Sequence, residues 1–123
     1  MNIIQIDLKS ADLAIFERIH TLFTRIEAER NPDDPAISVE LLKQRWQHEP
    51  DFVKIQAWCI EQWPDQPFVA LAWAVYLETE ENRHLMQVMI SVLPEFRRQG
   101  LGRRLLQQLI EYTRSKQRQL LLL

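Results

Sequence analysis

The segment from residue 92 to residue 106 contains residue types that could bind an anionic ligand. Its centre is Gln99-Gly100-Leu101-Gly102, which holds the only two glycines of the chain. Four arginines flank these glycines: Arg97, Arg98, Arg103 and Arg104. The pattern predicts a strand end, a short loop and a helix that begins at the glycines. The unpaired N–H groups and positive dipole at a helix start suit phosphate, and glycine lets the backbone approach it without a Cβ.

The charge distribution favours an anion site in this segment, and the spacing of its glycines excludes two common kinds of phosphate loop. Residues 95–118 carry 7 basic and 2 acidic side chains, whereas residues 1–94 carry 8 basic and 15 acidic ones. Such a local positive segment favours a local anionic ligand, with a solvated helix face as the alternative. A P-loop would end in Gly-Lys-Ser/Thr, which is absent, and a dinucleotide fingerprint would need three glycines early in the chain.

The string Arg97-x-x-Gly100-x-Gly102, preceded by Val92-x-Pro94, resembles the acetyl-CoA motif Gln/Arg-x-x-Gly-x-Gly/Ala of the GNAT superfamily of N-acyltransferases. The resemblance implies transfer of an acetyl group from acetyl-CoA to an amine of a small molecule or protein. No metal is expected, because one cysteine and three scattered histidines cannot form a zinc site. It places the thioester beside Val92 and the pyrophosphate on backbone N–H groups of residues 98–103. The implied residues for binding acetyl-CoA are Val92, Leu93, Arg97, Arg98, Gln99, Gly100, Leu101, Gly102 and Arg103. Catalysis would then rest on positioning and on backbone donors to the oxyanion.

The sequence does not single out a general base. The strand expected at residues 85–92 has only Gln87 and Ser91 as polar residues, and both are poor bases. The candidates that remain are Glu61, Glu78 and His84, with Glu80 and Glu81 beside them. Each of these has a solvated or structural role as the simpler interpretation, and a proton relayed through water is an equal alternative.

Other reactive or aromatic side chains receive structural interpretations. His20 lies between apolar residues of an expected helix and has no evident partner, and Cys59 in an apolar strand is expected to be a buried, inert thiol. Four tryptophans could line an acyl or acceptor pocket, but residues at these spacings more often belong to a core. They are Trp46, Trp58, Trp63 and Trp73.

The elements that must position the segment follow from hydrophobic periodicity. Residues 2–8 alternate as in a strand, Ser10 is the expected cap of a helix to about residue 29, and Ser38 is the expected cap of a second helix that ends before Pro50. Strands at 52–63, 68–77 and 85–92 predict an antiparallel meander. A helix at 100–116 and a buried parallel strand of leucines at 120–123 complete the order β-α-α-β-β-β-α-β. This order predicts an α+β fold with a mixed sheet, GNAT-like, in a single domain over residues 1–123.

Composition excludes several other classes. The chain is 46% hydrophobic and 26% charged, as in ordinary globular proteins. Its longest apolar run has ten residues, against about 20 for a membrane span. The N-terminal residues do not resemble a signal peptide, and the single cysteine suits a reducing compartment, so a cytoplasmic location is expected. The net charge of −2 and the lack of a nucleic-acid-reading motif argue against nucleic acid as a partner.

The chain also departs from the family pattern. Members of the family usually continue past the leucine strand with a helix and two further strands, and a tyrosine of that helix often protonates the leaving thiolate. Tyr112 is not that residue, because it lies in the preceding helix. Two alternatives to an active enzyme therefore stay open: a fragment of a longer protein, and a non-catalytic CoA-binding or regulatory module. An apolar edge at residues 120–123 would also suit pairing with a second copy of the chain.

Overall fold

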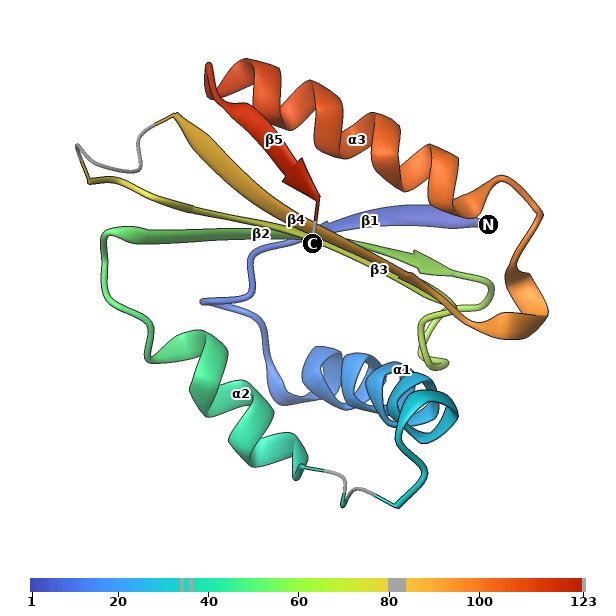
Figure 1. The fold of residues 1–123 in the computed structure, drawn as a ribbon. Coiled ribbons are helices and arrows are strands. Elements are labelled where there is room, and N and C mark those ends of the chain that lie inside the picture. Colours follow the sequence, from blue (N-terminus) through green and yellow to red (C-terminus); the bar gives the residue numbers. More distant parts are fainter. Residues whose placement is uncertain (34, 36, 80–83, 123) are drawn as a thin grey trace.

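The computed structural model describes residues 1–33, 35, 37–79 and 84–122. A mixed sheet separates two layers of helix, with α1 and α2 on one face and α3 on the other (Figure 1). The elements are β1 (Asn2–Ile6), α1 (Leu13–Arg30), α2 (Val39–Gln47), β2 (Val53–Glu61), β3 (Ala70–Leu77), β4 (Leu85–Val92), a 3-10 turn η1 (Pro94–Phe96), α3 (Leu101–Ser115) and β5 (Gln119–Leu122). The predicted α+β fold and element order are confirmed.

The strands lie side by side in the order β1-β2-β3-β4-β5. β1 to β4 pair antiparallel with one another, and β5 runs parallel to β4, as the leucine run predicted. The β4–β5 pairing extends from Leu85↔Gln119 to Val88↔Leu122. Beyond it, residues 89–92 of β4 pair with β3 on one side and have no strand partner among the described residues on the other.

The two N-terminal helices begin at side-chain caps. Ser38 accepts a hydrogen bond from the N–H of Leu41 at 3.1 Å, as predicted for the start of α2. For α1 the prediction of Ser10 is wrong, because Asp12 is the cap and accepts from the N–H of Ile15 at 3.0 Å. Ser10 instead donates its backbone N–H to Asp7 in the preceding turn.

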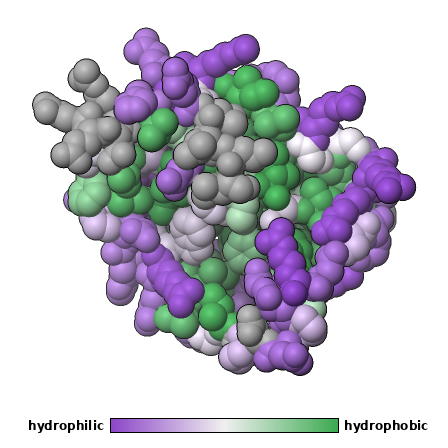
Figure 2. All heavy atoms as spheres, in the orientation of Figure 1, coloured by the Kyte–Doolittle hydropathy of each residue, from purple (hydrophilic) through white to green (hydrophobic). Residues whose placement is uncertain are grey.

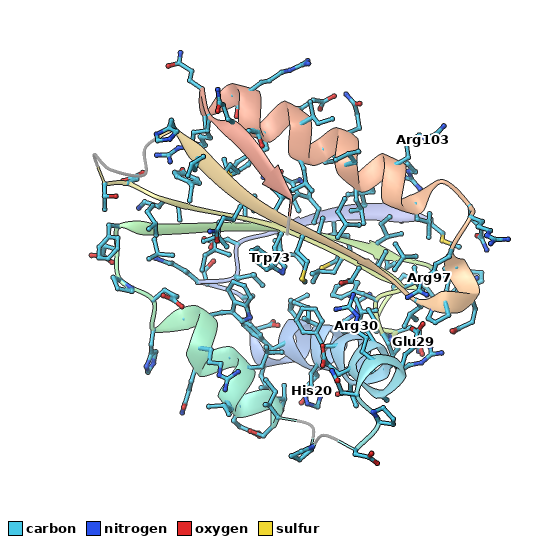
Figure 3. All side chains as sticks on the ribbon, in the orientation of Figure 1. His20, Glu29, Arg30, Trp73, Arg97 and Arg103 are labelled. Carbon is cyan, nitrogen blue, oxygen red and sulfur yellow. The ribbon has the colours of Figure 1, made fainter. Side chains whose placement is uncertain are left out.

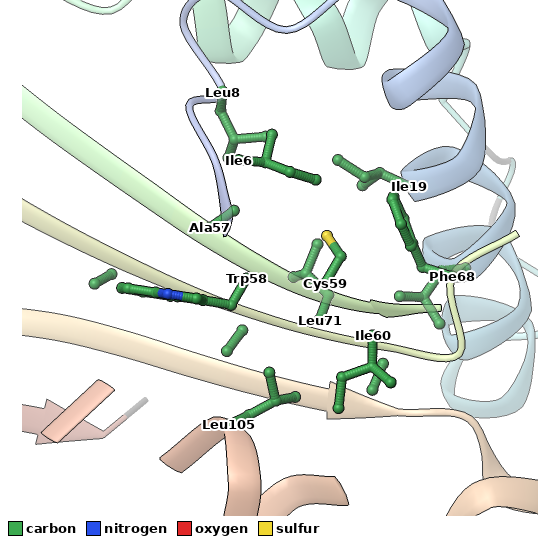
Figure 4. Packing of buried hydrophobic residues seen from close by; sticks show 14 of the residues in the cluster. Ile6, Leu8, Ile19, Ala57, Trp58, Cys59, Ile60, Phe68, Leu71 and Leu105 are labelled. Atoms are coloured by element: carbon green, nitrogen blue, oxygen red, sulfur yellow. The ribbon is translucent and has the colours of Figure 1, made fainter. Parts of the chain in front are cut away.

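Both faces of the sheet are packed against apolar helix stripes. On one face α1 contributes Phe16, Ile19, Leu22 and Ile26, and on the other α3 contributes Leu101, Leu105 and Leu109. Figure 4 shows Ile19 and Phe68 beside the sheet on one face and Leu105 on the other. Burying each such side chain stabilises the fold by roughly 1.5–3 kcal/mol. Cys59 is fully buried in this core, as expected, and that burial raises the pKa of its thiol.

None of the helices in the described part of the chain is both long enough and apolar enough to cross a membrane.

Candidate functional site

The loop between β4 and α3 has two left-handed residues. Leu93 is anchored by donating its N–H to the carbonyl of Val69 at 3.0 Å. Arg98 then has φ +63° and Gly100, the cap residue of α3, has φ +81°. Most L-residues avoid this region at a cost of roughly 1–2 kcal/mol, whereas glycine adopts it freely. A Cβ added at Gly100 would meet no atom within 4 Å, so the backbone there faces open space.

A hollow of about 540 Å³ lies over the start of α3. The first hydrogen bond of the α3 ladder joins the N–H of Arg104 to the carbonyl of Gly100 at 3.0 Å, so the N–H groups of residues 101–103 have no partner within the helix. On the inner side, a Cβ at Gly102 would lie 4.0 Å from Cγ2 of Val92. The lining residues are Val92, Phe96, Arg97, Arg98, Gly100, Leu101, Gly102 and Arg103. We name this hollow the cradle; its free donors suit a pyrophosphate.

The cradle brings together most of the residues expected to bind acetyl-CoA, but not all of them. Leu93 lies beneath it in the core with 3% of its surface exposed, and the side chain of Gln99 turns back to the carbonyl of Glu95 at 3.4 Å. Phe96 lines the cradle and was not anticipated, because an isolated aromatic residue after a proline carries no distinctive signal. The binding roles of these residues remain predictions.

Ion pairs change the expected role of the arginines. Arg97 forms a two-pronged pair with Glu29 of α1 at 3.1 and 3.2 Å, and its Nε donates to the carbonyl of Val92 at 3.1 Å. In Figure 3 Arg97 and Glu29 point toward one another, whereas Arg103 lies at the start of α3. A second pair joins Arg25 of α1 to Glu95, with one N···O distance of 2.7 Å. These two pairs tie the loop to α1.

The positive charge available to an anion is therefore smaller than the sequence indicated. The carboxylate of Glu29 offsets Arg97, and Arg104 donates to the carbonyl of Met1 at 3.2 Å. Arg98 and Arg103 have no ion pair or side-chain hydrogen bond within the described residues. They remain as the two side-chain charges that can meet a phosphate at the cradle.

A second pocket, of about 640 Å³, lies between α1, α2 and the sheet. Its floor comes from strands β3 and β4 through Trp73, Met89 and Ser91. Trp46 of α2 meets Trp73 edge to face, with ring centroids 5.7 Å apart. The other lining residues are His20, Phe23, Thr24, Glu27, Ala28, Arg30, Pro32, Pro35, Ile37, Leu42, Arg45 and Glu49. We name it the helix-side pocket. In the view of Figure 2, hydrophobic side chains show in the middle of the molecule, and mostly hydrophilic ones lie around its edge.

Neighbouring residues at the end of β4 line the two hollows. Successive side chains of a strand point to opposite faces of the sheet. Ser91 accordingly lines the helix-side pocket, while the next residue, Val92, lines the cradle. The stretch of β4 next to both, residues 89–92, has an edge without a strand partner among the described residues. A ligand that lies along this edge can thus reach a second ligand on the other face.

The base candidates do not gather at this point. Glu61 is nearly buried and pairs with Arg18 at 2.7 Å, and Arg18 also lies over the ring of Phe68. The carboxylate of Glu61 is thus engaged in a structural ion pair. Glu78 and His84 lie at the opposite end of the sheet, roughly 25 Å from Val92 by the length of an eight-residue strand. Glu80 and Glu81 lie outside the described residues.

Two features of the helix-side pocket differ from the interpretation that the sequence favoured. The prediction that His20 has no partner is wrong: its Nε2 is hydrogen-bonded to the carbonyl of Ile37. A carbonyl can only accept, so Nε2 carries the proton and Nδ1 is the basic nitrogen of the neutral ring. Trp46 and Trp73 were assigned to the core, yet both stay partly exposed on the pocket wall. They are 27 positions apart in sequence, so no local pattern relates them.

In the part of the chain that the structure describes, no group of three or more His, Cys, Asp or Glu side chains could hold a metal ion.

Comparisons with known proteins agree on one fold. A sequence profile of the acetyltransferase (GNAT) family matches residues 16–122. Among solved structures, an aminoglycoside acetyltransferase from an uncultured soil metagenomic sample, in complex with sisomicin, superposes with a TM-score of 0.68 at 17% identity, covering 99% of this chain and 76% of that one. A GNAT-family acetyltransferase from Streptococcus pneumoniae gives 0.69 at 15% identity, covering 98% and 73%. A putative phosphinothricin N-acetyltransferase gives 0.70 at 14% identity, covering 98% and 72%. No curated protein matched the sequence.

Proposed function

Because the chain belongs to the acetyltransferase (GNAT) family, we propose that it transfers an acetyl group from acetyl-CoA to the nitrogen of an amine. The observation that carries this proposal is the cradle at the start of α3, where Gly100 leaves the backbone open beside free N–H groups and two uncommitted arginines. Free helix N–H groups, a positive dipole end and arginine side chains are the donors that a pyrophosphate needs.

The chain would hold acetyl-CoA from the cradle to the unpaired edge of β4. N–H groups of residues 101–103 would bind the pyrophosphate, with Arg98 and Arg103 adding charge. Backbone groups of residues 89–92 would bind the rest of the donor, because they have no strand partner on that side among the described residues. The acceptor would enter by the helix-side pocket, whose floor reaches Ser91.

The reaction is an exchange of one acyl bond for another. The amine nitrogen bonds to the thioester carbonyl carbon, the C–S bond breaks, and the sulfur leaves as CoA thiolate. The proton lost by the amine passes to water or to the sulfur, so the products are an N-acetyl amide and CoA. The protein supplies proximity across the end of β4 and donors for the oxyanion. Ser91 is the polar side chain of β4 at this point and orients the amine or a water by hydrogen bonding.

Calorimetric titration with acetyl-CoA tests the binding step. Arg103→Ala and Arg98→Ala should each weaken binding by about tenfold, because each removes a charge-assisted contact to phosphate. Arg114→Ala is the matched control, since it removes an exposed arginine from the last turn of α3 and should leave the affinity unchanged. Affinity should also fall as salt rises. Equal affinities for all four proteins, or a flat salt dependence, would show that Arg98 and Arg103 take no part in binding acetyl-CoA.

A non-catalytic CoA-binding module is the second candidate function. It is favoured by one observation, namely that Ser91 is the polar side chain of β4 at its cradle end, while Glu78 and His84 lie at the far end of the sheet. Release of CoA thiol from acetyl-CoA in the presence of a panel of amines separates the two. Tight binding without thiol release above the uncatalysed rate would favour the module.

A further inference from the structure

The helix-side pocket combines an aromatic floor with a charged rim. Trp46 and Trp73 meet edge to face and keep part of their surface exposed, although both pack against the core. Phe23 of α1 and Met89 of β4 extend the same apolar surface. The volume of about 640 Å³ lies in the ordinary range of small-molecule sites, roughly 300–1,000 Å³. This shape and lining suit one compact ligand with a flat apolar body.

Among the described residues that line the pocket, the charges of the rim cancel. Two carboxylates, Glu27 and Glu49, are matched by two guanidinium groups, Arg30 and Arg45, and all four side chains are exposed. A site for a polycation such as a polyamine or an aminoglycoside needs an excess of acidic groups, because each ammonium loses hydration when it binds. The balance found here gives such a ligand no net attraction. The selective part of the pocket is therefore its apolar floor.

The polar and the aromatic residues of the pocket occupy different positions along the strands. Ser91 precedes Val92, which lines the cradle. Trp73 pairs with Met89, two residues before Ser91 along β4, and Trp46 meets Trp73 edge to face. An amine on a short chain can thus reach Ser91 while a ring attached to that chain contacts Trp73. Apolar surroundings disfavour a charged ammonium, so they lower the pKa of the bound amine and increase its nucleophilic, uncharged fraction. This helps a site whose carboxylates lie on the exposed rim.

From these observations we propose that the acceptor is an arylalkylamine, a primary amine on a short chain that carries an aromatic ring, with the ring held against Trp46 and Trp73. This inference rests on the proposed acetyl transfer. The products are the N-acetyl arylalkylamine and CoA: the new bond is N–C(carbonyl), the broken one is C–S, and the amine proton leaves to water or to the sulfur. Ring contacts with aromatic side chains in edge-to-face or offset geometry would hold the acceptor.

Two measurements test the acceptor class. The first is kcat/KM with saturating acetyl-CoA for tryptamine and phenethylamine against butylamine, spermidine and an aminoglycoside. We expect the two arylalkylamines to exceed the others by 100-fold or more. The second is binding of tryptamine to the protein alone, followed by calorimetry, so that it does not depend on turnover.

Variants locate the site. Trp46→Ala should weaken tryptamine binding and raise its KM by about tenfold with little change in the KM of acetyl-CoA, and Trp46→Phe should restore most of the loss. Trp63→Ala is the matched control, because Trp63 is 65% exposed and does not line the pocket. Circular dichroism shows whether Trp46→Ala is folded. If it is not, Trp46→Leu takes its place in the comparison with Trp46→Phe.

The outcomes separate this inference from the proposed function. Three results would each overturn the inference and leave the acetyl transfer intact. They are acetyl-CoA binding and turnover without preference for arylalkylamines, a preference for spermidine or the aminoglycoside, and a tryptamine affinity of Trp46→Leu equal to that of the wild type. Tryptamine binding that depends on Trp46, without any binding of acetyl-CoA, would support the pocket assignment and overturn the proposed function.

Discussion

The two glycines of the loop should respond in opposite ways to alanine. At Gly100, with φ +81°, a Cβ adds strain of roughly 1–2 kcal/mol, partly offset by the lower entropy of the unfolded chain, about 0.4–1 kcal/mol. No atom lies within 4 Å of that Cβ, so strain is the only cost. Gly100→Ala should therefore lower the free energy of unfolding by about 1 kcal/mol.

At Gly102 the same substitution should be mildly favourable. Gly102 lies inside the first turn of α3, where its φ is not positive, and its Cβ would be in ordinary contact with Cγ2 of Val92 at 4.0 Å. Alanine inside a helix stabilises a protein by roughly 0.5–1 kcal/mol relative to glycine, so Gly102→Ala should raise the free energy of unfolding by about 0.5 kcal/mol. The two variants should then differ by about 1.5 kcal/mol in the free energy of unfolding.

Thermal unfolding measures this difference. The unfolding entropy of 123 residues is about 0.26 kcal/mol/K, so 1.5 kcal/mol corresponds to a gap of about 6 °C in Tm. Calorimetry with acetyl-CoA on the same proteins supplies the binding arm, in which Gly100→Ala should bind less tightly than Gly102→Ala because its Cβ projects into the cradle. Equal Tm values for the two variants, or a higher Tm for Gly100→Ala, would show that α3 does not start with a left-handed residue.

Three further outcomes are expected. Burial raises the pKa of the Cys59 thiol, so Ellman's reagent should label no thiol in the native protein at pH 8 and one per chain in denaturant; native labelling at the rate of a free thiol would contradict this burial. The hydrogen bond from Arg25 lowers the pKa of Glu95 below its ordinary value of 4.5, so the stabilisation is present above that pH and is lost as the pH falls through the lowered value. The Tm difference between wild type and Glu95→Gln should accordingly be visible at pH 7 and shrink below pH 4.5, and a difference that grows in acid would refute the sign. Glu61→Ala leaves Arg18 charged and nearly buried, so urea unfolding should report a loss of about 3 kcal/mol, while an unchanged stability would mean that the pair is not formed.

The sequence by itself determined the elements and the loop. Apolar residues recurring with a period of two or of 3.6 mark strands and helices because side chains alternate across a strand and gather on one side of a helix. The bounds of β4 followed from such a pattern. The parallel direction of β5 followed from an unbroken run of leucines after a helix, and the start of α3 from the glycines. These features depend on neighbours within a few residues. The cap of α1 did not follow, because Ser and Asp are both good caps. In the structure Ser10 lies in a turn that closes on the carbonyl of Asp7, and Asp12 caps the helix.

Only the tertiary structure decided which distant residues meet. The charge of Arg97 is taken up by Glu29, 68 positions earlier, so a residue expected to face phosphate became the tie between the loop and α1. Trp46 of α2 and Trp73 of β3 meet edge to face and both line the helix-side pocket, although they are 27 positions apart in sequence. Glu78 and His84 are too far from Val92 to act as bases there, because the antiparallel strands put them at the opposite end of the sheet. Periodicity states which face a side chain occupies, but the packing of whole elements sets which faces touch and at which end of the sheet a residue lies.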